Sequence, residues 1–208
     1  MASLEDITGV KSFHSCKDEV IERKKMGRIL EAGRFAPSPG KRQTIEFIVV
    51  EDHGTLDHLS DILGDHRVEE APTSVVIVTD PERMARRVKK PVEACYAEAS
   101  GSAQNMRILA SSEGLCSNLY TGFDEDSVAN LLNVPSGKAP LAVVSFGYSD
   151  NPIEPSDRFG MNEICFYDEY GKQIQSVFDG FEWEGLNEEK EVYMKKFRGL
   201  IQKIKNFG

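Results

Sequence analysis

The stretch ASGSAQNMRILASSEGLCSN, residues 99–118, contains the pattern that decides the fold. Its small and apolar side chains recur at helical spacing, at Ala99, Ala103, Met106 and Ala110. This pattern predicts a long helix over residues 92–113, whose inner face is small enough to approach a sheet or another helix closely. Gly114 follows the last of these positions, where glycine typically ends a helix. An extended stretch is expected next, over residues 115–123.

Further strands and helices are expected on both sides of this helix. Short runs of β-branched and aromatic residues, typical of strands, occupy residues 45–51, 73–79, 141–146 and 163–167. Helical patterns occupy residues 18–35, a segment after Thr55, a charged segment after Asp80 and a segment that begins at Asp124. The regular alternation of a doubly wound fold is missing. The sequence therefore predicts an α+β fold, with a small mixed, mainly antiparallel sheet flanked by helices.

The length and composition describe an ordinary globular protein. A chain of 208 residues fits one domain, and its net charge of -9 argues against general nucleic-acid binding, which needs a basic surface. No apolar run reaches the length of a membrane span. The start, MASLEDITGV, lacks the basic and apolar regions of a secretory signal. We therefore expect a cytoplasmic protein that binds neither nucleic acid nor membrane.

Two segments of different character are expected. Residues 1–170 contain all the predicted strands, whereas residues 171–208 form a C-terminal extension. Within that extension, residues 188–207 carry apolar residues at helical spacing among lysines, which predicts an amphipathic helix. Such a helix can pack on its own subunit or against a partner.

Several kinds of chemistry have no support in the sequence. Neither a phosphate-binding G-x-x-x-x-G-K-[ST] loop nor a G-x-G-x-x-G turn after a strand is present. No serine lies in a G-x-S-x-G elbow, and no H-E-x-x-H occurs. The four cysteines are scattered without metal-ligand spacing, so we expect reduced thiols without a nucleophilic role. The sequence predicts no metal site and no catalytic side chain.

Local patterns along the chain favour a binding site instead. Residues 11–14, KSFH, place a serine hydroxyl among groups that can be cationic, which suits a phosphate. Residues 36–43, APSPGKRQ, form a loop that prolines restrict and that offers polar side chains. Gly122 follows Tyr120-Thr121, where a glycine allows close approach of the backbone to a flat ligand. Each pattern alone also has an ordinary structural explanation.

Taken together, these patterns resemble the nitroreductase family of FMN-dependent oxidoreductases, over residues 7–170. The segment ILEAGRFAPSPGKRQTIEFIVVED is similar to the family's "APS" loop between a helix and a strand. ASGSAQNMRILASSEGLCSN resembles its central "QN" helix, and NVPSGKAPLAVVSFGY resembles its "GIP … GYP" stretch. The resemblance implies an FMN enzyme that works as a homodimer. The resemblance also implies that such an enzyme transfers hydride from NAD(P)H through the flavin to an electron-poor acceptor such as a nitroaromatic or a quinone.

The resemblance also implies roles for individual residues. The segment from Lys11 to His14 matches the one that holds the flavin phosphate and ribityl chain, and Arg158 matches a late arginine on the phosphate. The loop at residues 37–39 matches the one that reaches the flavin from the opposite subunit. Thr121 and Gly122 match the pair whose backbone lies against the central ring. The predicted cofactor-binding residues are Lys11, Ser12, His14, Pro37, Ser38, Pro39, Lys41, Gln43, Thr121, Gly122 and Arg158.

The chain departs from the family pattern at a few of these positions. Val10 stands where an arginine is usual, and His14 and Lys41 also replace the commoner residues. His14 and Lys41 are candidates for positive charge beside the flavin's pyrimidine edge. Two other possibilities stay open: a flavin-sequestering or regulatory protein with little turnover, and an interaction domain that binds no flavin. Related folds that split flavin, dehalogenate aromatic rings or dehydrogenate peptides form a further enzyme alternative.

Overall fold

The computed structural model describes residues 4–84 and 88–172 of the chain. The chain divides into two compact units, Met1–Pro155 and Ser156–Gly208. The first unit contains the sheet and the helices around it. The expected domain boundary after residue 170 stays a prediction, and the predicted amphipathic helix at 188–207 lies outside the described residues.

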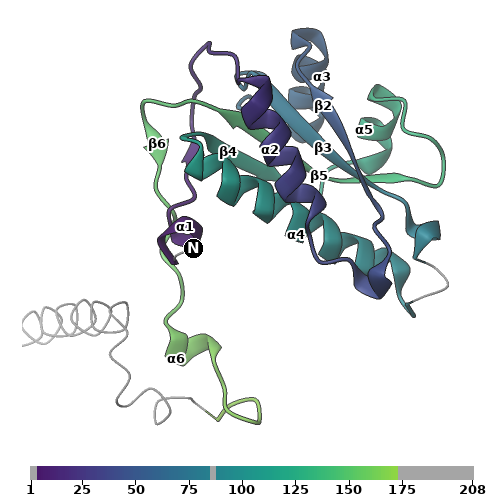
Figure 1. Cartoon of the computed structure of the whole chain (residues 1–208), viewed down its shortest axis with the longest axis vertical. Helices are drawn as coiled ribbons and strands as arrows, with labels where there is room; N and C mark the ends of the chain where they lie inside the picture. The colour runs from purple at the N-terminus through teal and green to yellow at the C-terminus, as the bar shows by residue number, and fades with distance from the viewer. Residues whose placement is uncertain (1–3, 85–87, 173–208) are drawn as a thin grey trace, which may run out of the picture. The chain divides into compact units, whose positions relative to one another are not determined.

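The centre of the first unit is an antiparallel sheet of four strands (Figure 1). Its strands are β2 (Ile45–Val50), β3 (Thr73–Thr79), β5 (Ala139–Gly147) and β4 (Cys116–Tyr120), in that spatial order. Each neighbouring pair is antiparallel. The strands at 45–51, 73–79 and 141–146 and the extended stretch at 115–123 are thereby confirmed.

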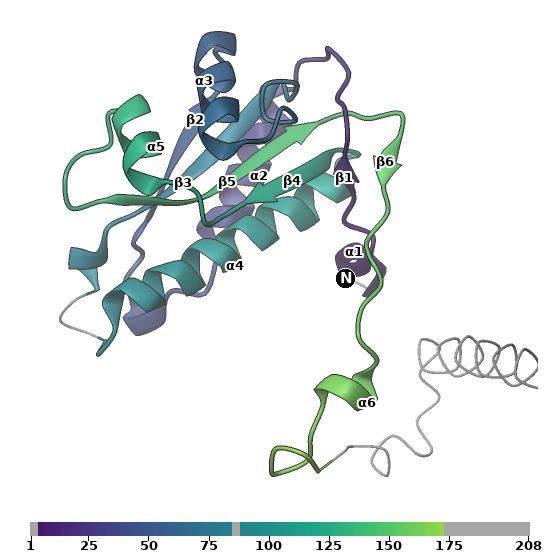
Figure 2. The ribbon, with the colours of Figure 1, turned by 180° about the vertical axis from the view of Figure 1, so that it is seen from behind.

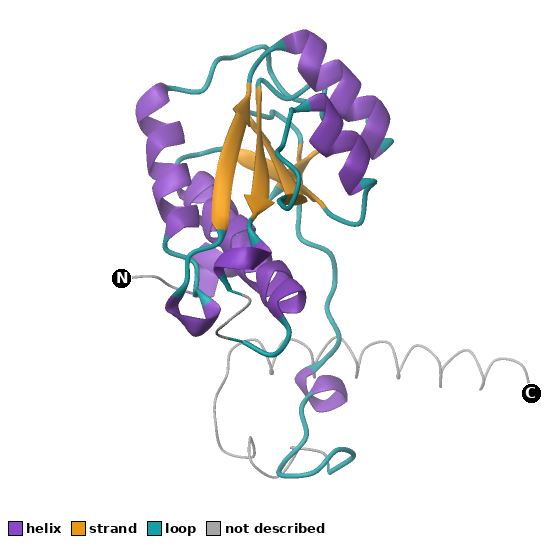
Figure 3. Ribbon diagram, turned by 90° about the vertical axis from the view of Figure 1, so that its right-hand side faces the viewer, coloured by secondary structure: helices purple, strands orange, loops and turns teal. Residues whose placement is uncertain are grey.

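Helices cover both faces of this sheet. Helices α2 (Arg23–Arg34) and α4 (Pro91–Ser112) lie together on one face. Helices α3 (His53–Leu63) and α5 (Glu125–Leu131) lie on the other face, as the view from behind in Figure 2 shows. Figure 3 shows the sheet between these two helical layers. This arrangement confirms the α+β fold with a mainly antiparallel sheet.

The strand β3 shows why the sheet can be buried on both faces. All seven of its residues are buried, and its side chains alternate between the faces because successive residues of a strand point in opposite directions. Val75 and Ile77 belong to the core under α2 and α4. Val76 and Val78 belong to the core under α3 and α5. A continuous apolar run therefore serves two separate cores.

The helices α2 and α4 approach closely because small residues face each other. A Cβ atom on Gly33 would lie 2.3 Å from Met106 Cε and 2.9 Å from Ser102 Oγ, and Asn105 Nδ2 donates a hydrogen bond to the Ala32 carbonyl at 3.2 Å. The inner face predicted for the central helix is confirmed, since Ala99, Ala103, Met106 and Ala110 are all buried.

The short elements frame this core. Helix α1 (Leu4–Thr8) precedes β1 (Ser12–Phe13), which pairs antiparallel with β6 (Pro152–Ile153). Two single turns of 3₁₀ helix, η1 (Pro39–Lys41) and η2 (Pro81–Arg83), lie in the connections after α2 and β3.

Two expectations from the sequence are wrong. The stretch 163–167 is not a strand: helix α6 (Met161–Ile164) of the second unit covers its first two residues, and residues 165–167 belong to no strand. Glu163 starts that helix by accepting a hydrogen bond from the Gly160 amide at 2.8 Å. The charged segment after Asp80 begins with the single turn η2 instead of a longer helix, and the Asp80 carboxylate caps that turn through the Glu82 amide.

A substitution at Gly33 tests how closely α2 and α4 must approach. We expect Gly33→Ala to lower the free energy of unfolding by about 1–3 kcal/mol, because the added methyl overpacks a filled contact. Gly27→Ala is the matched control on the same helix, since a Cβ there meets no atom within 4 Å. The control should raise stability by about 0.5–1 kcal/mol through helix propensity. Urea unfolding measures both; equal effects would contradict the close contact.

Candidate functional site

The segment that contains Lys11 and Ser12 lies along the free edge of β4. The Ser117 amide donates a hydrogen bond to the Lys11 carbonyl at 3.0 Å. The buried Asn118 side chain then replaces a backbone partner: its Nδ2 donates to the Phe13 carbonyl at 3.0 Å, and its Oδ1 accepts from the Phe13 amide at 3.3 Å. These bonds fix residues 11–13 beside the start of β4. His14, one residue further, is exposed.

Positive charge gathers near this edge. The Lys11 ammonium forms an ion pair with Glu154 at 2.7 Å, and this hydrogen bond, more than the charge, raises the Lys11 pKa. From helix α4, Arg107 Nε donates to Ser117 Oγ at 3.2 Å. Arg107 is not among the residues predicted from the sequence, although its long cationic side chain interrupts a helix of small residues. Asn118 is not among them either, because an asparagine in a short strand gives no signal of its distant partner.

The loop that carries Ser38 rests against the middle of α4. Pro37 Cδ lies 3.6 Å from the position that a Cβ on Gly101 would take. Gln43 Nε2 donates to the Arg34 carbonyl at 3.1 Å, so this side chain closes the loop back onto α2. Ser38 Oγ is shielded from solvent and has no hydrogen-bond partner among the described residues.

Thr121 and Gly122 form an exposed turn directly after β4. Gly122 has a φ of 75°, and a Cβ atom there would meet nothing within 4 Å. The turn borders a groove of about 420 Å³. The groove is lined by Ile62, Leu63, Leu119, Tyr120, Thr121, Gly122 and Phe123. Burial raises the pKa of Tyr120 to about 12, so its hydroxyl stays neutral at physiological pH.

The predicted site residues fall into separate groups. Lys11 and Ser12 lie at the start of β4, and Thr121 and Gly122 lie just beyond its end. The loop at 37–43 lies further away, because Gly101 is beside Pro37 whereas Ser111 of the same helix donates to the Gly9 carbonyl. These two positions on α4 are about 15 Å apart at 1.5 Å per residue. One chain therefore does not bring the loop together with the N-terminal segment.

Arg158 belongs to the second unit. Its side chain is exposed, and Nη1 donates to Ser156 Oγ at 2.9 Å. This placement neither joins Arg158 to the other predicted residues nor separates it from them.

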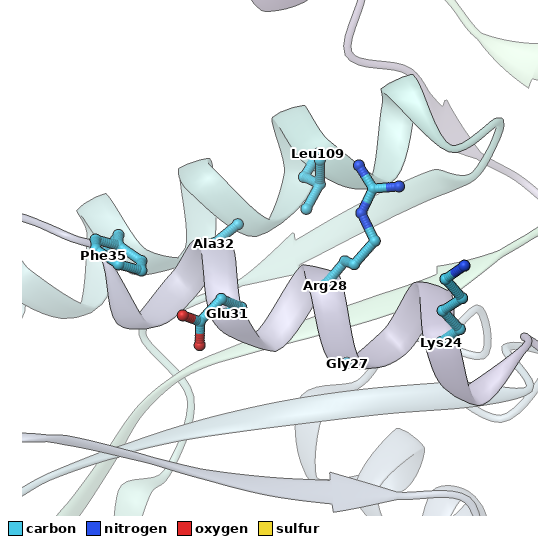
Figure 4. A pocket seen from close by; sticks show the side chains of 7 residues that line it. All are labelled: Lys24, Gly27, Arg28, Glu31, Ala32, Phe35 and Leu109. Atoms are coloured by element: carbon cyan, nitrogen blue, oxygen red, sulfur yellow. The ribbon is translucent and has the colours of Figure 1, made fainter.

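A larger groove of about 620 Å³ lies between the outer faces of α2 and α4 (Figure 4). Its lining is formed by Lys24, Gly27, Arg28, Glu31, Ala32, Phe35 and Leu109. Phe35 is 69% exposed at the end of α2, and the Arg34 guanidinium lies 4.7 Å from its ring centroid. None of the residues predicted to bind a cofactor lines this groove.

The cysteines and acidic side chains of the described residues form no metal centre. Among the described residues, no group of three or more His, Cys, Asp or Glu is placed to hold a metal ion. Burial raises the pKa of Cys16 to about 12 and also raises the pKa values of Cys95 and Cys116. These thiols are therefore poor nucleophiles near neutral pH.

The helices of the described ranges are too short or too polar to span a bilayer.

Comparison with known proteins agrees with the fold. The model of the nitroreductase family matches residues 63–148, which include β3, α4, β4 and β5. The chain is therefore similar to the nitroreductase family over this stretch. An NADH dehydrogenase of Thermus thermophilus is 26% identical over 187 residues, which cover 76% of this chain and 91% of that protein.

Solved structures of the family have the same fold. An FMN-dependent nitroreductase from Clostridium difficile has a TM-score of 0.71 and 25% identity, covering 81% of this chain and all of that one. An NADPH:FMN oxidoreductase from Vibrio harveyi, solved with NAD+, has a TM-score of 0.74 at 21% identity. The match covers 92% of this chain and 90% of the Vibrio harveyi chain. The fold expected from the sequence and the resemblance to the nitroreductase family are thus confirmed, and the individual site residues stay predictions.

The Asn118 side chain can be tested as the clamp of the N-terminal segment. In Asn118→Asp, a carboxylate oxygen faces the Phe13 carbonyl, so we expect a loss of about 1–3 kcal/mol in unfolding free energy and faster hydrogen exchange of the Phe13 amide. Asn105→Asp is the control, since that side chain also donates to a backbone carbonyl but on α2. Unchanged exchange at Phe13 in Asn118→Asp would show that β1 is held without this bond.

The raised pKa of Cys16 predicts slow thiol chemistry in the folded protein. Since the thiolate is the reacting species, labelling of Cys16 at pH 7.5 should be at least about tenfold slower in the folded chain than in urea. Mass spectrometry of labelled peptides measures this rate for each cysteine. Equal rates in the two states would show that Cys16 is neither buried nor shifted.

Proposed function

We propose that this chain is an FMN-dependent oxidoreductase that takes hydride from NAD(P)H and reduces an electron-poor acceptor. The observation that carries the proposal is the arrangement along β4. The first half of β4 binds the backbone of the segment that contains Lys11 and Ser12. The far end of the strand leads into the open turn at Gly122. From Ser117 to Thr121 the strand advances about 13 Å. A molecule with a phosphate at one end and a flat ring at the other suits this spacing.

The residues at both ends fit such a cofactor. Lys11 is paired with Glu154 only through an exposed ion pair, and such pairs are easily exchanged for another anion. Ser12, which carries a hydroxyl, is the next residue of the same segment. At the other end, the backbone of Gly122 is open, because no atom lies where a side chain would be. We propose that Lys11 and Ser12 hold the phosphate and that Thr121 and Gly122 contact the ring. The role of Arg158, in the second unit, stays a prediction from the family resemblance.

The loop at 37–43 is proposed to act on the cofactor of a second subunit. It lies too far along α4 to join Lys11 within one chain, and Ser38 Oγ is a buried hydroxyl without a partner in the described part of the chain. Buried hydroxyls are nearly always hydrogen-bonded, so a partner subunit or ligand is expected to complete it. The exposed Phe35 beside the groove of α2 and α4 gives the homodimer an apolar surface.

The bound FMN supplies the redox chemistry, and the protein supplies binding, orientation and charge. In this proposal no side chain acts as nucleophile or general acid. His14 and Lys41 are both exposed, and they are proposed as the positive groups beside the ring. The groove next to Thr121 and Gly122 leaves room beside the ring for the nicotinamide and then for the acceptor, which bind in turn.

The visible absorption spectrum of the purified protein is the first experiment. We expect a flavin spectrum, release of FMN on heating at close to one per subunit, and oxidation of NAD(P)H that depends on an added quinone or nitroaromatic compound. A colourless protein that takes up no added FMN would overturn the proposal. Bound FMN with negligible turnover would instead favour a flavin-sequestering protein.

Lys11 and Lys17 form a matched pair for testing the phosphate site. Both are lysines of the N-terminal segment that form an ion pair with a carboxylate, Glu154 and Asp150 respectively. Since charge-assisted bonds contribute about 1.5–3 kcal/mol, we expect Lys11→Ala to weaken FMN binding by roughly tenfold or more. Lys17→Ala should leave the affinity nearly unchanged. Fluorescence titration of the apo-protein measures both; equal weakening would mean that Lys11 acts only through net charge.

A further inference from the structure

Glu98 is the one charged side chain that is buried within the described ranges, with 1% of its surface exposed. It lies in α4, one turn before Gly101. Burying a carboxylate is costly unless hydrogen bonds compensate it. A well-packed apolar residue is often at least as favourable at such a position. The proposed chemistry of the flavin site does not use this carboxylate, so its presence needs a separate physical reason.

The Glu98 carboxylate binds a single residue, Thr44, through several bonds. Both carboxylate oxygens accept from the Thr44 amide at 3.3 Å, and Oε2 also accepts from Thr44 Oγ1 at 2.6 Å. The Thr44 carbonyl accepts from the Asp80 amide at 3.0 Å. Thr44 is itself fully buried. Its backbone is therefore fixed on both sides at the point where the loop enters β2.

The same helix fixes the other end of the loop. Pro37 and Ala36 lie 3.6 and 3.8 Å from the position of a Cβ on Gly101. Because residues three apart on a helix are neighbours on its surface, Glu98 and Gly101 form one anchoring face. Residues 37–43 thus connect two contacts with one turn of α4: Pro37 beside Gly101 and Thr44 beside Glu98.

The loop between these anchors has an unfavourable backbone. Gly40 and Lys41 both have left-handed conformations, with φ values of 68° and 56°. A non-glycine residue in this region costs about 1 kcal/mol or more and persists only where its surroundings hold it. The hydrogen bonds between Glu98 and Thr44 provide that support, because Thr44 lies three residues after Lys41. Without them, the loop would be expected to relax.

We propose that Glu98 is a positioning residue, which holds the loop at 37–43 in the shape that presents Ser38 and Lys41 to the flavin. This inference rests on the proposed function, since the loop matters for binding only if it contacts FMN. Glu98 itself touches no ligand in this scheme. It acts through Thr44 alone.

The test compares Glu98→Gln with a control that breaks another buried hydrogen bond. The side-chain amide of this variant cannot accept at both positions, so we expect the Kd for FMN to rise about tenfold, equivalent to about 1.4 kcal/mol. Hydrogen exchange of amides at residues 38–44 should accelerate in the same variant without flavin. Ser74→Ala is the control, because it removes another buried hydrogen bond, the 2.7 Å bond between Ser74 of β3 and Ser145 of β5. It should lose stability with no change in Kd or loop exchange.

Two Thr44 variants keep the test decisive if Glu98→Gln fails to fold. Thr44→Val removes the hydroxyl and should weaken FMN binding, whereas Thr44→Ser retains it and should bind like the wild type. The inference is overturned if Glu98→Gln, or Thr44→Val in its place, matches the control in both Kd and loop exchange. A wild-type chain that binds no FMN would refute the proposed function. The exchange measurement on residues 38–44 would then still decide whether Glu98 holds the loop.

Discussion

The close approach of α2 to α4 determines much of this structure. Gly33 leaves room for Met106 and Ser102, and the small face of α4 lets the helix pair pack on the sheet as one layer. The direction in which α2 ends then fixes where the next loop begins. Because protein interiors are close-packed, a larger residue at this contact would displace that loop as well as the helices. The position of the loop at 37–43 thus depends on a packing contact that lies outside it.

The edge strand β4 links the core to the candidate site. An edge strand has unpaired backbone groups, which other segments can use. Here the Ser117 amide and the Asn118 side chain hold the N-terminal segment along that edge. The far end of the same strand leads into the open turn at Gly122. One short strand therefore sets the distance between the segment that contains Lys11 and the open turn at Gly122.

The acidic residues near the site have two different roles. Glu154 is exposed and pairs with Lys11, so solvent and other anions compete for the same ammonium group. Glu98 is buried and bound only by neutral donors of Thr44, so its loss would leave a polar gap that solvent cannot easily fill. The exposed pair can respond to a ligand, whereas the buried carboxylate maintains a shape. In the proposed function, both kinds of contact are needed around one anionic cofactor.

The sequence by itself determined the strands at 45–51 and 73–79, the central helix and the α+β fold, because side-chain periodicity is a local property. The order of the motifs also gave the resemblance to the nitroreductase family, which the match over residues 63–148 supports. Only the tertiary structure placed Asn118 beside Phe13 and Glu98 beside Thr44, pairs 105 and 54 residues apart in the chain. It also showed a helix over Met161–Ile164, where the sequence predicted that a strand begins at Glu163, and a bond from the Gly160 amide to Glu163 caps that helix. Hydrogen bonds between distant residues leave no periodic pattern, so only the folded chain reveals them.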